Sequence, residues 1–292
     1  MRPLLISALV RVLALLPLSV AHGLGAMIGR CIHTLPTPVR RVTDINLNLS
    51  FPERTQDWRT RTARASLIET GKSVAEAAYL WRASAPRITT LVRSSTGQAV
   101  MDAAIAQHRG VILAAPHLGS WELCGLYSTT LGTITSLYRP PRLAALEPLM
   151  RAGREHTGAR LVPTETHGIK ALVRALNERQ MVGILPDQVP HPGNGVYAPF
   201  FGIDSYTMGL VSRLARKRRV PVIFMYAERL GKARGFVIHY RRAGDDIYDP
   251  DPVIAATALN ASVEQMVREC PTQYGWSYKR FKDRPPGAAQ FY

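Results

Sequence analysis

One stretch, VILAAPHLGSWELCGL at residues 111–126, constrains the fold more than any other part of the chain. It opens with five small or branched apolar residues, Val111 to Ala115, which is the composition of a buried strand. Pro116 stops the strand, and Gly119 to Leu126 suits a helix. A strand that leads at once into a helix is typical of an α/β sheet, which presents reactive side chains at such turns. We therefore expect functional residues at this junction.

The chain around this stretch alternates between strand-like and helix-like segments. The region from Pro38 to Trp81 has a helical pattern, and the alternation begins after it. We expect strands at 88–92, 111–115, 134–138, 181–185, 220–227 and 236–240, and helices at 97–107, 121–131, 143–157, 169–177, 208–218 and 252–270. This order predicts an α/β fold, with a central, mostly parallel or mixed sheet flanked by helices, in one domain over residues 31–292.

Residues 3–29 are almost wholly apolar and are interrupted by Arg11, Pro17 and His22. Roughly 20 apolar residues suffice to cross a bilayer, although a charge and a proline disfavour a straight span. We expect a hydrophobic helical membrane anchor at residues 1–30, which either spans the membrane or lies in it as a kinked hairpin. A cleaved secretory signal and a helix buried in the protein's own core are the alternatives.

The net charge of +16 calls for an anionic partner, such as nucleic acid, an anionic bilayer surface or an acidic substrate. A basic run, RLARKRR at residues 213–219, ends a predicted helix. It is either a solvated helix end, which the helix dipole favours, or a docking surface for an acidic protein or for anionic head groups. No helix-turn-helix, RNP or zinc-finger pattern occurs in the sequence, so we expect no nucleic-acid partner.

Two titratable side chains, His117 and Glu122, lie in the 111–126 stretch. On one continuous helix they would point about 140° apart, so they meet only if His117 lies in the turn before the helix. Glu122 would then accept a hydrogen bond from one ring nitrogen and leave the other free to act as a general base. The alternative is that His117 only caps a buried helix.

Other chemistry at this junction is less well supported by the sequence. Ser120 is not in a G-x-S-x-G elbow, so an acyl-serine route is disfavoured. Cys124 lies inside the predicted helix, where a packed thiol is more common than a nucleophile. His117, Glu122 and Asp187 have no spacing typical of a metal site, so we expect no metal and no other cofactor.

The segment AAPHLGSWE resembles the H-x-x-x-x-[DE] block of the glycerolipid and lipid A acyltransferases. It is most similar to the version found in the bacterial lipid A biosynthesis (late) acyltransferases, the lauroyl and myristoyl transferases of the lysophospholipid acyltransferase superfamily. Three further blocks resemble the same family in the same order: YRPPRLAALEPLMRAGREHTGARLVP, GILPDQVPHPGNGVYAPFFG and PTQYGWSYKRFKDRPPG. The similarity covers nearly the whole chain, and four ordered blocks are far more specific than one.

This resemblance implies roles for individual residues. His117 would be the general base that takes a proton from a substrate hydroxyl as it attacks a thioester, and Glu122 would be its partner. The residues that would contact substrate are Tyr138, Arg139, Arg154, Asp187 and Gln188, with the arginines on phosphate or on the oxyanion and the last two shaping the acceptor pocket. The N–H groups of Gly119 and Ser120, at the start of the helix, are a further candidate site for the oxyanion.

The resemblance also implies an activity, in which a fatty acyl chain moves from acyl carrier protein to a hydroxyl of a lipid A precursor. The expected partners are an acidic acyl carrier protein, a phosphorylated glycolipid acceptor and inner-membrane lipids, with the catalytic domain on the cytoplasmic side of the inner membrane. There are two alternatives. One is acylation of another glycolipid or lysophospholipid from acyl carrier protein or acyl-CoA, and the other is a non-catalytic basic membrane-binding protein. Departures from the family pattern at 141–144 and 205–209 leave the acceptor and the acyl length open.

Overall fold

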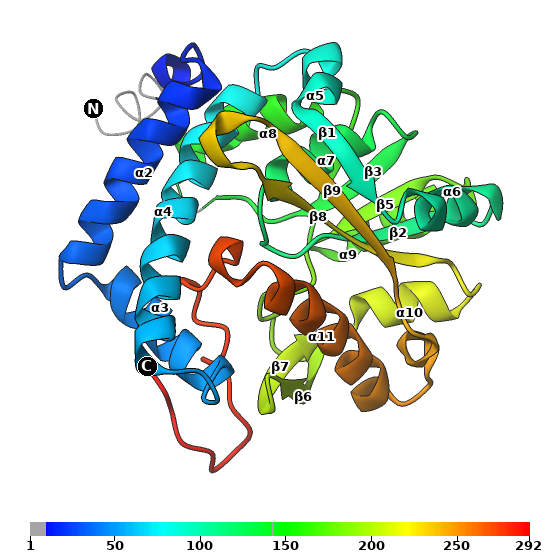
Figure 1. The fold of residues 1–292 in the computed structure, drawn as a ribbon. Coiled ribbons are helices and arrows are strands. Elements are labelled where there is room, and N and C mark those ends of the chain that lie inside the picture. Colours follow the sequence, from blue (N-terminus) through cyan, green and yellow to red (C-terminus); the bar gives the residue numbers. More distant parts are fainter. Residues whose placement is uncertain (1–9, 142) are drawn as a thin grey trace.

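The computed structural model describes residues 10–141 and 143–292. Within them lies a seven-stranded sheet in the order β1-β9-β8-β2-β5-β3-β4 (Figure 1). Its strands are β1 (Val92–Thr96), β2 (Val111–Ala114), β3 (Ile134–Tyr138), β4 (Arg160–Pro163), β5 (Met181–Ile184), β8 (Val222–Arg229) and β9 (Phe236–Arg242). Neighbouring strands are parallel except β8 and β9. The prediction of a central, mostly parallel sheet flanked by helices is confirmed.

Helices cover both faces of this sheet (Figure 1). The first face packs against α9 (Thr166–Asn177), α10 (Leu210–Arg216) and α11 (Pro252–Glu269). The opposite face packs against α5 (Ala85–Leu91), α6 (Gln98–Ala106) and α7 (Trp121–Ser128). In β8, Phe224 belongs to the first core, and Ile223 and Met225 belong to the second. Because both faces are buried, the central strands are continuous apolar runs.

The N-terminal part forms three helices, α2 (Leu18–Thr34), α3 (Pro38–Ser50) and α4 (Gln56–Leu80). Glycines bring α2 and α4 into close contact, since a Cβ at Gly25 would lie only 2.4 Å from the carbonyl oxygen of Gly71. No helix in the described residues is long and apolar enough to cross a membrane. The predicted N-terminal membrane anchor is therefore wrong where the structure describes it, and residues 1–9 of that segment lie outside the described residues.

Some element boundaries also differ from the prediction. Residues 85–91 form α5 instead of the start of a strand, because Ile88 and Leu91 lie three apart and are buried on one helical face. A separate hairpin, β6 (Gly195–Phe200) and β7 (Ile203–Met208), was not predicted. The two residues of its turn, Phe201 and Gly202, both have positive φ, which is typical of a tight hairpin turn.

Candidate active site

The turn between β2 and α7 is fixed by backbone contacts on both sides. Gly119 has φ of +63°, and a Cβ there would lie 2.0 Å from the carbonyl oxygen of Ala227. Its N–H donates to the carbonyl of Gln273 (3.0 Å), and the N–H of Ser120 donates to the carbonyl of Ala227 (2.8 Å). Both N–H groups are thus already occupied. The expectation that Gly119 and Ser120 hold the oxyanion is corrected by this geometry.

His117 is held by Asp187, which follows the neighbouring strand β5. The backbone N–H of His117 donates to Oδ2 and its ring Nδ1 lies 2.9 Å from Oδ1. The carboxylate is buried at 4% exposure. Burial alone would raise the pKa of Asp187, but the charge and hydrogen bonds of His117 outweigh it and lower that pKa. The ionised carboxylate therefore favours a proton on Nδ1, which leaves the lone pair of the ring on Nε2.

Glu122 makes a different ion pair from the one expected. Its two carboxylate oxygens accept from the guanidinium of Arg154 at 2.6 and 2.9 Å, and Oε2 also accepts from the indole of Trp81 at 3.1 Å. The Arg154 guanidinium also stacks over the ring of Trp121, at 5.0 Å. The predicted hydrogen bond between His117 and Glu122 is therefore wrong in this structure, because Asp187 takes the ring nitrogen and Arg154 takes the carboxylate. The predicted catalytic role of Glu122 stays a prediction.

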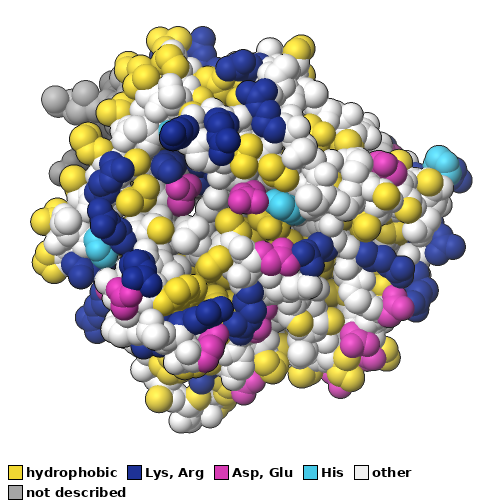
Figure 2. Space-filling view, viewed as in Figure 1, with side chains coloured by type: hydrophobic (Ala, Val, Ile, Leu, Met, Phe, Trp, Pro, Cys, Tyr) yellow, Lys and Arg dark blue, Asp and Glu magenta, His cyan; other side chains and the backbone are white. Residues whose placement is uncertain are grey.

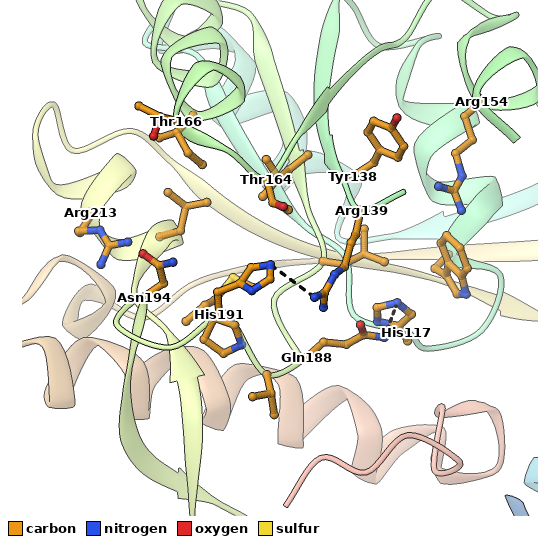
Figure 3. Close-up of a pocket in the computed structure, with 18 of the residues that line it drawn as sticks. His117, Tyr138, Arg139, Arg154, Thr164, Thr166, Gln188, His191, Asn194 and Arg213 are labelled. Atoms are coloured by element: carbon orange, nitrogen blue, oxygen red, sulfur yellow. Dashed lines mark hydrogen bonds between the residues drawn. The ribbon is translucent and has the colours of Figure 1, made fainter. Parts of the chain in front are cut away.

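A cavity of about 520 Å³, which we call the main cavity, opens beside His117 (Figure 3). The residues of the predicted site that line it are His117, Tyr138, Arg139, Arg154 and Gln188. Asp187 lies behind His117 rather than in the lining. The side-chain amide of Gln188 is 3.1 Å from the Nε2 atom of His117, so Nε2 faces the cavity with Gln188 beside it.

The hydroxyl of Tyr138 is engaged by a carboxylate of the protein itself. This hydroxyl donates to Glu147 at 2.5 Å, and that hydrogen bond, together with burial, raises the pKa of Tyr138. The phenol is therefore neutral at physiological pH, and Tyr138 contributes to the wall of the main cavity.

A second, narrower space of about 70 Å³, which we call the side crevice, adjoins the main cavity. Trp121, Tyr138 and Arg154 line both spaces. The rest of the side crevice is largely apolar and includes Leu113, Gly125, Leu126, Ile134, Leu161 and Met225. Cys124 also lines it, and burial raises the pKa of that thiol to about 12. Cys124 is thus a protonated, packed thiol, as its position in the helix indicated.

Five polar residues of the main cavity, two of which are Thr164 and Thr166, were not predicted as site residues. His191 and Asn194 come from the loop between β5 and β6, and Arg213 comes from α10. The sequence offered a signal for these last three, since His191 and Asn194 lie in the third family block and Arg213 opens the basic run. The sequence did not show that α10 directs Arg213 toward the main cavity (Figure 3).

Fold and site together define an α/β enzyme with a histidine–carboxylate pair at the end of a central strand. Beside this pair lie a cavity lined by both polar and apolar residues and a narrower apolar crevice. The chain belongs to the bacterial lipid A biosynthesis acyltransferase family, whose pattern it matches over residues 3–283. It is 25% identical to the lipid A biosynthesis palmitoleoyltransferase of Escherichia coli K12, over 95% of this chain and 90% of that protein. It is also 25% identical to the myristoyltransferase (96% and 86%) and 24% identical to the lauroyltransferase (95% and 90%) of the same organism.

Proposed function

We propose that this acyltransferase moves a fatty acyl chain from acyl carrier protein to a hydroxyl of a lipid A precursor and so forms an acyloxyacyl ester. The observation that carries the proposal is the ordered pair of His117 and Asp187, which faces a cavity with three arginines in its wall, beside an apolar crevice. The first space suits the polar part of a glycolipid, and the second suits a hydrocarbon chain.

In the proposed reaction, His117 acts as the general base. Asp187 accepts the Nδ1 hydrogen, so Nε2 takes the proton of the acceptor hydroxyl while its oxygen attacks the thioester carbonyl carbon. The carbon–sulfur bond then breaks, and the imidazolium returns the proton to the departing thiolate. General base catalysis of this kind typically contributes roughly 10²- to 10⁴-fold. The ionised Asp187 also stabilises the imidazolium that forms between the two steps.

Gln188 supplies a hydrogen-bond donor for the oxyanion, which the turn at Gly119 and Ser120 does not supply. Its amide lies 3.1 Å from the Nε2 atom of His117, where the acceptor hydroxyl must arrive. The acceptor hydroxyl replaces the Gln188 amide at the lone pair of His117 Nε2. The amide then stays next to the reacting carbon and can donate to the developing oxyanion. The N–H groups of Gly119 and Ser120, which donate within the fold, leave this task to a side chain.

The donor and the place of the reaction are part of the same proposal. Figure 2 shows Lys and Arg side chains spread over one face of the molecule, which is consistent with the net charge of +16. Such a surface attracts an acidic carrier protein and anionic head groups alike. Because the acceptor is a membrane lipid, we propose that the enzyme works at the cytoplasmic face of the inner membrane.

A panel of substrates tests the proposal. The purified protein would be given acyl carrier protein or coenzyme A thioesters of one acyl chain, each with a lipid A precursor or a lysophospholipid. We expect mass spectrometry to find one added acyl chain on the lipid A precursor, formed fastest from the carrier-protein thioester. Preferential acylation of the lysophospholipid would replace the proposed acceptor. No transfer in any of the four combinations would contradict the proposed function.

A further inference from the structure

The main cavity has a pronounced imbalance of charge. Three arginines line it, and no Asp or Glu is among its lining residues in the described part of the chain. Arg154 is neutralised by Glu122 behind it. Arg139 and Arg213 form no ion pair within 4.0 Å with any described side chain. Two guanidinium groups therefore face one hollow without a counter-charge.

Two further hydrogen-bonding side chains, His191 and Asn194, accompany these guanidiniums. The Nε2 atom of His191 lies 3.4 Å from Nη2 of Arg139. In Figure 3, His191 lies between Arg139 and Arg213, and Asn194 is drawn next to Arg213. Arg213 folds back over the start of its own helix, since its Nη1 would lie 3.0 Å from a Cβ at Gly209. The four side chains come from three separate segments and are all exposed at the solvent side of the cavity.

Arginine forks with no carboxylate nearby are suited to phosphate, because their planar donors match two phosphate oxygens at once. The concave, partly apolar wall strengthens the positive field of the two cations. A phosphate at the solvent edge would also leave the rest of its molecule free to reach inward to His117, whose side chain is only 23% exposed.

We propose that Arg139, His191 and Arg213 bind a phosphate group of a substrate at the solvent edge of the main cavity. The inference rests on the proposed function and adds a binding site to it. Such a phosphate belongs either to the glycolipid acceptor or to the phosphopantetheine arm of the donor. The chemistry of recognition is the same in both cases, so the experiment must separate the two sources.

The experiment compares Arg139→Gln and Arg213→Gln with the parent enzyme. Arg109→Gln is the matched control, because this exposed arginine lies just before the amino end of β2, whereas His117 and the main cavity lie beyond its carboxyl end. The acceptors are the bisphosphorylated lipid A precursor and its two singly dephosphorylated forms. The donors are acyl carrier protein thioester and an acyl-pantetheine thioester without phosphate. kcat/KM is measured for each combination, together with the affinity for acceptor alone by tryptophan fluorescence.

We expect each cavity variant to lower kcat/KM about tenfold on one phosphorylated substrate, mainly through KM, and to change nothing on the form that lacks this phosphate. The substrate that shows this dependence identifies the source of the phosphate, and Arg109→Gln should match the parent. Equal losses on all substrates, or no loss, would overturn the phosphate site while leaving the proposed function intact. If the parent transfers no acyl chain at all, the proposed function fails. Equal acceptor affinity in parent and variants would overturn a site for the acceptor phosphate, and an equal loss of kcat/KM with both donors would overturn a site for the donor phosphate.

Discussion

The Asp187 carboxylate holds His117 at two atoms, the ring Nδ1 and the backbone N–H, each at 2.9 Å. This double contact fixes both the direction of the ring and the nitrogen that carries its proton. Glu122, in contrast, forms a buried fork with Arg154. At the scale of residues, one carboxylate therefore positions the base, and the other positions a cation between the two spaces of the site.

Substituting these two carboxylates separates their roles. In Asp187→Asn, the amide can present its N–H to Nδ1 and turn the lone pair away from Nε2, so we expect kcat to fall by about 10²- to 10⁴-fold. In Glu122→Gln, the partly buried Arg154 loses its counter-charge, so we expect unfolding free energy to fall by about 3 kcal/mol. Steady-state kinetics and urea unfolding of both variants check this. A larger stability loss in Asp187→Asn and a larger kcat loss in Glu122→Gln would reverse the assignment.

The sequence predicted His117 as the base but did not predict Asp187 as its partner. Spacing draws attention to Glu122, five residues away, whereas Asp187 is 70 residues further along the chain. The two residues meet because β2 and β5 are adjacent and parallel, with Ala114 opposite Ile184, so the loops after them leave the sheet at the same edge. Strand order of this kind is set by the packing of the whole sheet, which no local pattern records.

Helix α7 forms one wall of the side crevice, and this gives a test at the scale of elements. Gly125 lines the crevice, and no atom lies within 4 Å of a Cβ placed there. A leucine at this position would occupy space that the proposal assigns to the acyl chain. We expect Gly125→Leu to shift the preference toward shorter chains, measured as the ratio of kcat/KM for 12- and 16-carbon donors.

The control for this substitution is Gly23→Leu, at a helical glycine that is exposed on α2 and also has no atom within 4 Å of an added Cβ. It should leave the chain-length ratio unchanged. If Gly125→Leu also leaves the ratio unchanged while kcat stays at the parent value, the side crevice does not hold the acyl chain.

Secondary structure was predicted well where the pattern is local and strong. The strand at 134–138 and the helix starting at Pro252 were placed as the structure has them. Strand β4 was missed because four residues at the edge of a sheet carry little periodicity. The N-terminal segment was misread because its apolar composition does not show that α2 begins only after Pro17 and packs against α4 through small residues such as Gly25 and Gly29.

At the scale of the whole molecule, a buried network joins the N-terminal helices to the sheet and to the catalytic turn. Arg229 of β8 forms ion pairs with Glu69 and Glu76 of α4, and His22 of α2 lies 2.7 Å from Glu76. Also in α4, the hydroxyl of Ser73 donates to the carbonyl of Gly119 (3.4 Å). Folding of α2 and α4 is therefore coupled to the position of the turn that carries His117.

The pH dependence of stability reports on this network. Burial favours a raised pKa for Glu76, but the charge and hydrogen bonds of Arg229 outweigh it and lower the pKa from 4.5 to about 2. A lowered pKa stabilises the fold above pH 4.5, and this contribution is lost as the pH falls toward 2. We expect Glu76→Gln to be less stable than the parent at pH 7, with a gap that narrows over this window. Urea unfolding at several pH values measures it, and a constant gap would contradict the network's role.

We propose that His117 is the base for acyl transfer, and a single-turnover measurement of that transfer is the most direct test of this role. His117→Asn would be compared with His108→Asn, a control at an exposed histidine before β2 whose positive φ asparagine tolerates. With enzyme in excess over carrier-protein thioester and lipid A precursor, the acylated product is followed by mass spectrometry. We predict a rate at least about 100-fold lower for His117→Asn, with unfolding unchanged, and the parent rate for His108→Asn. Transfer by His117→Asn at the parent rate would show that His117 is not the base.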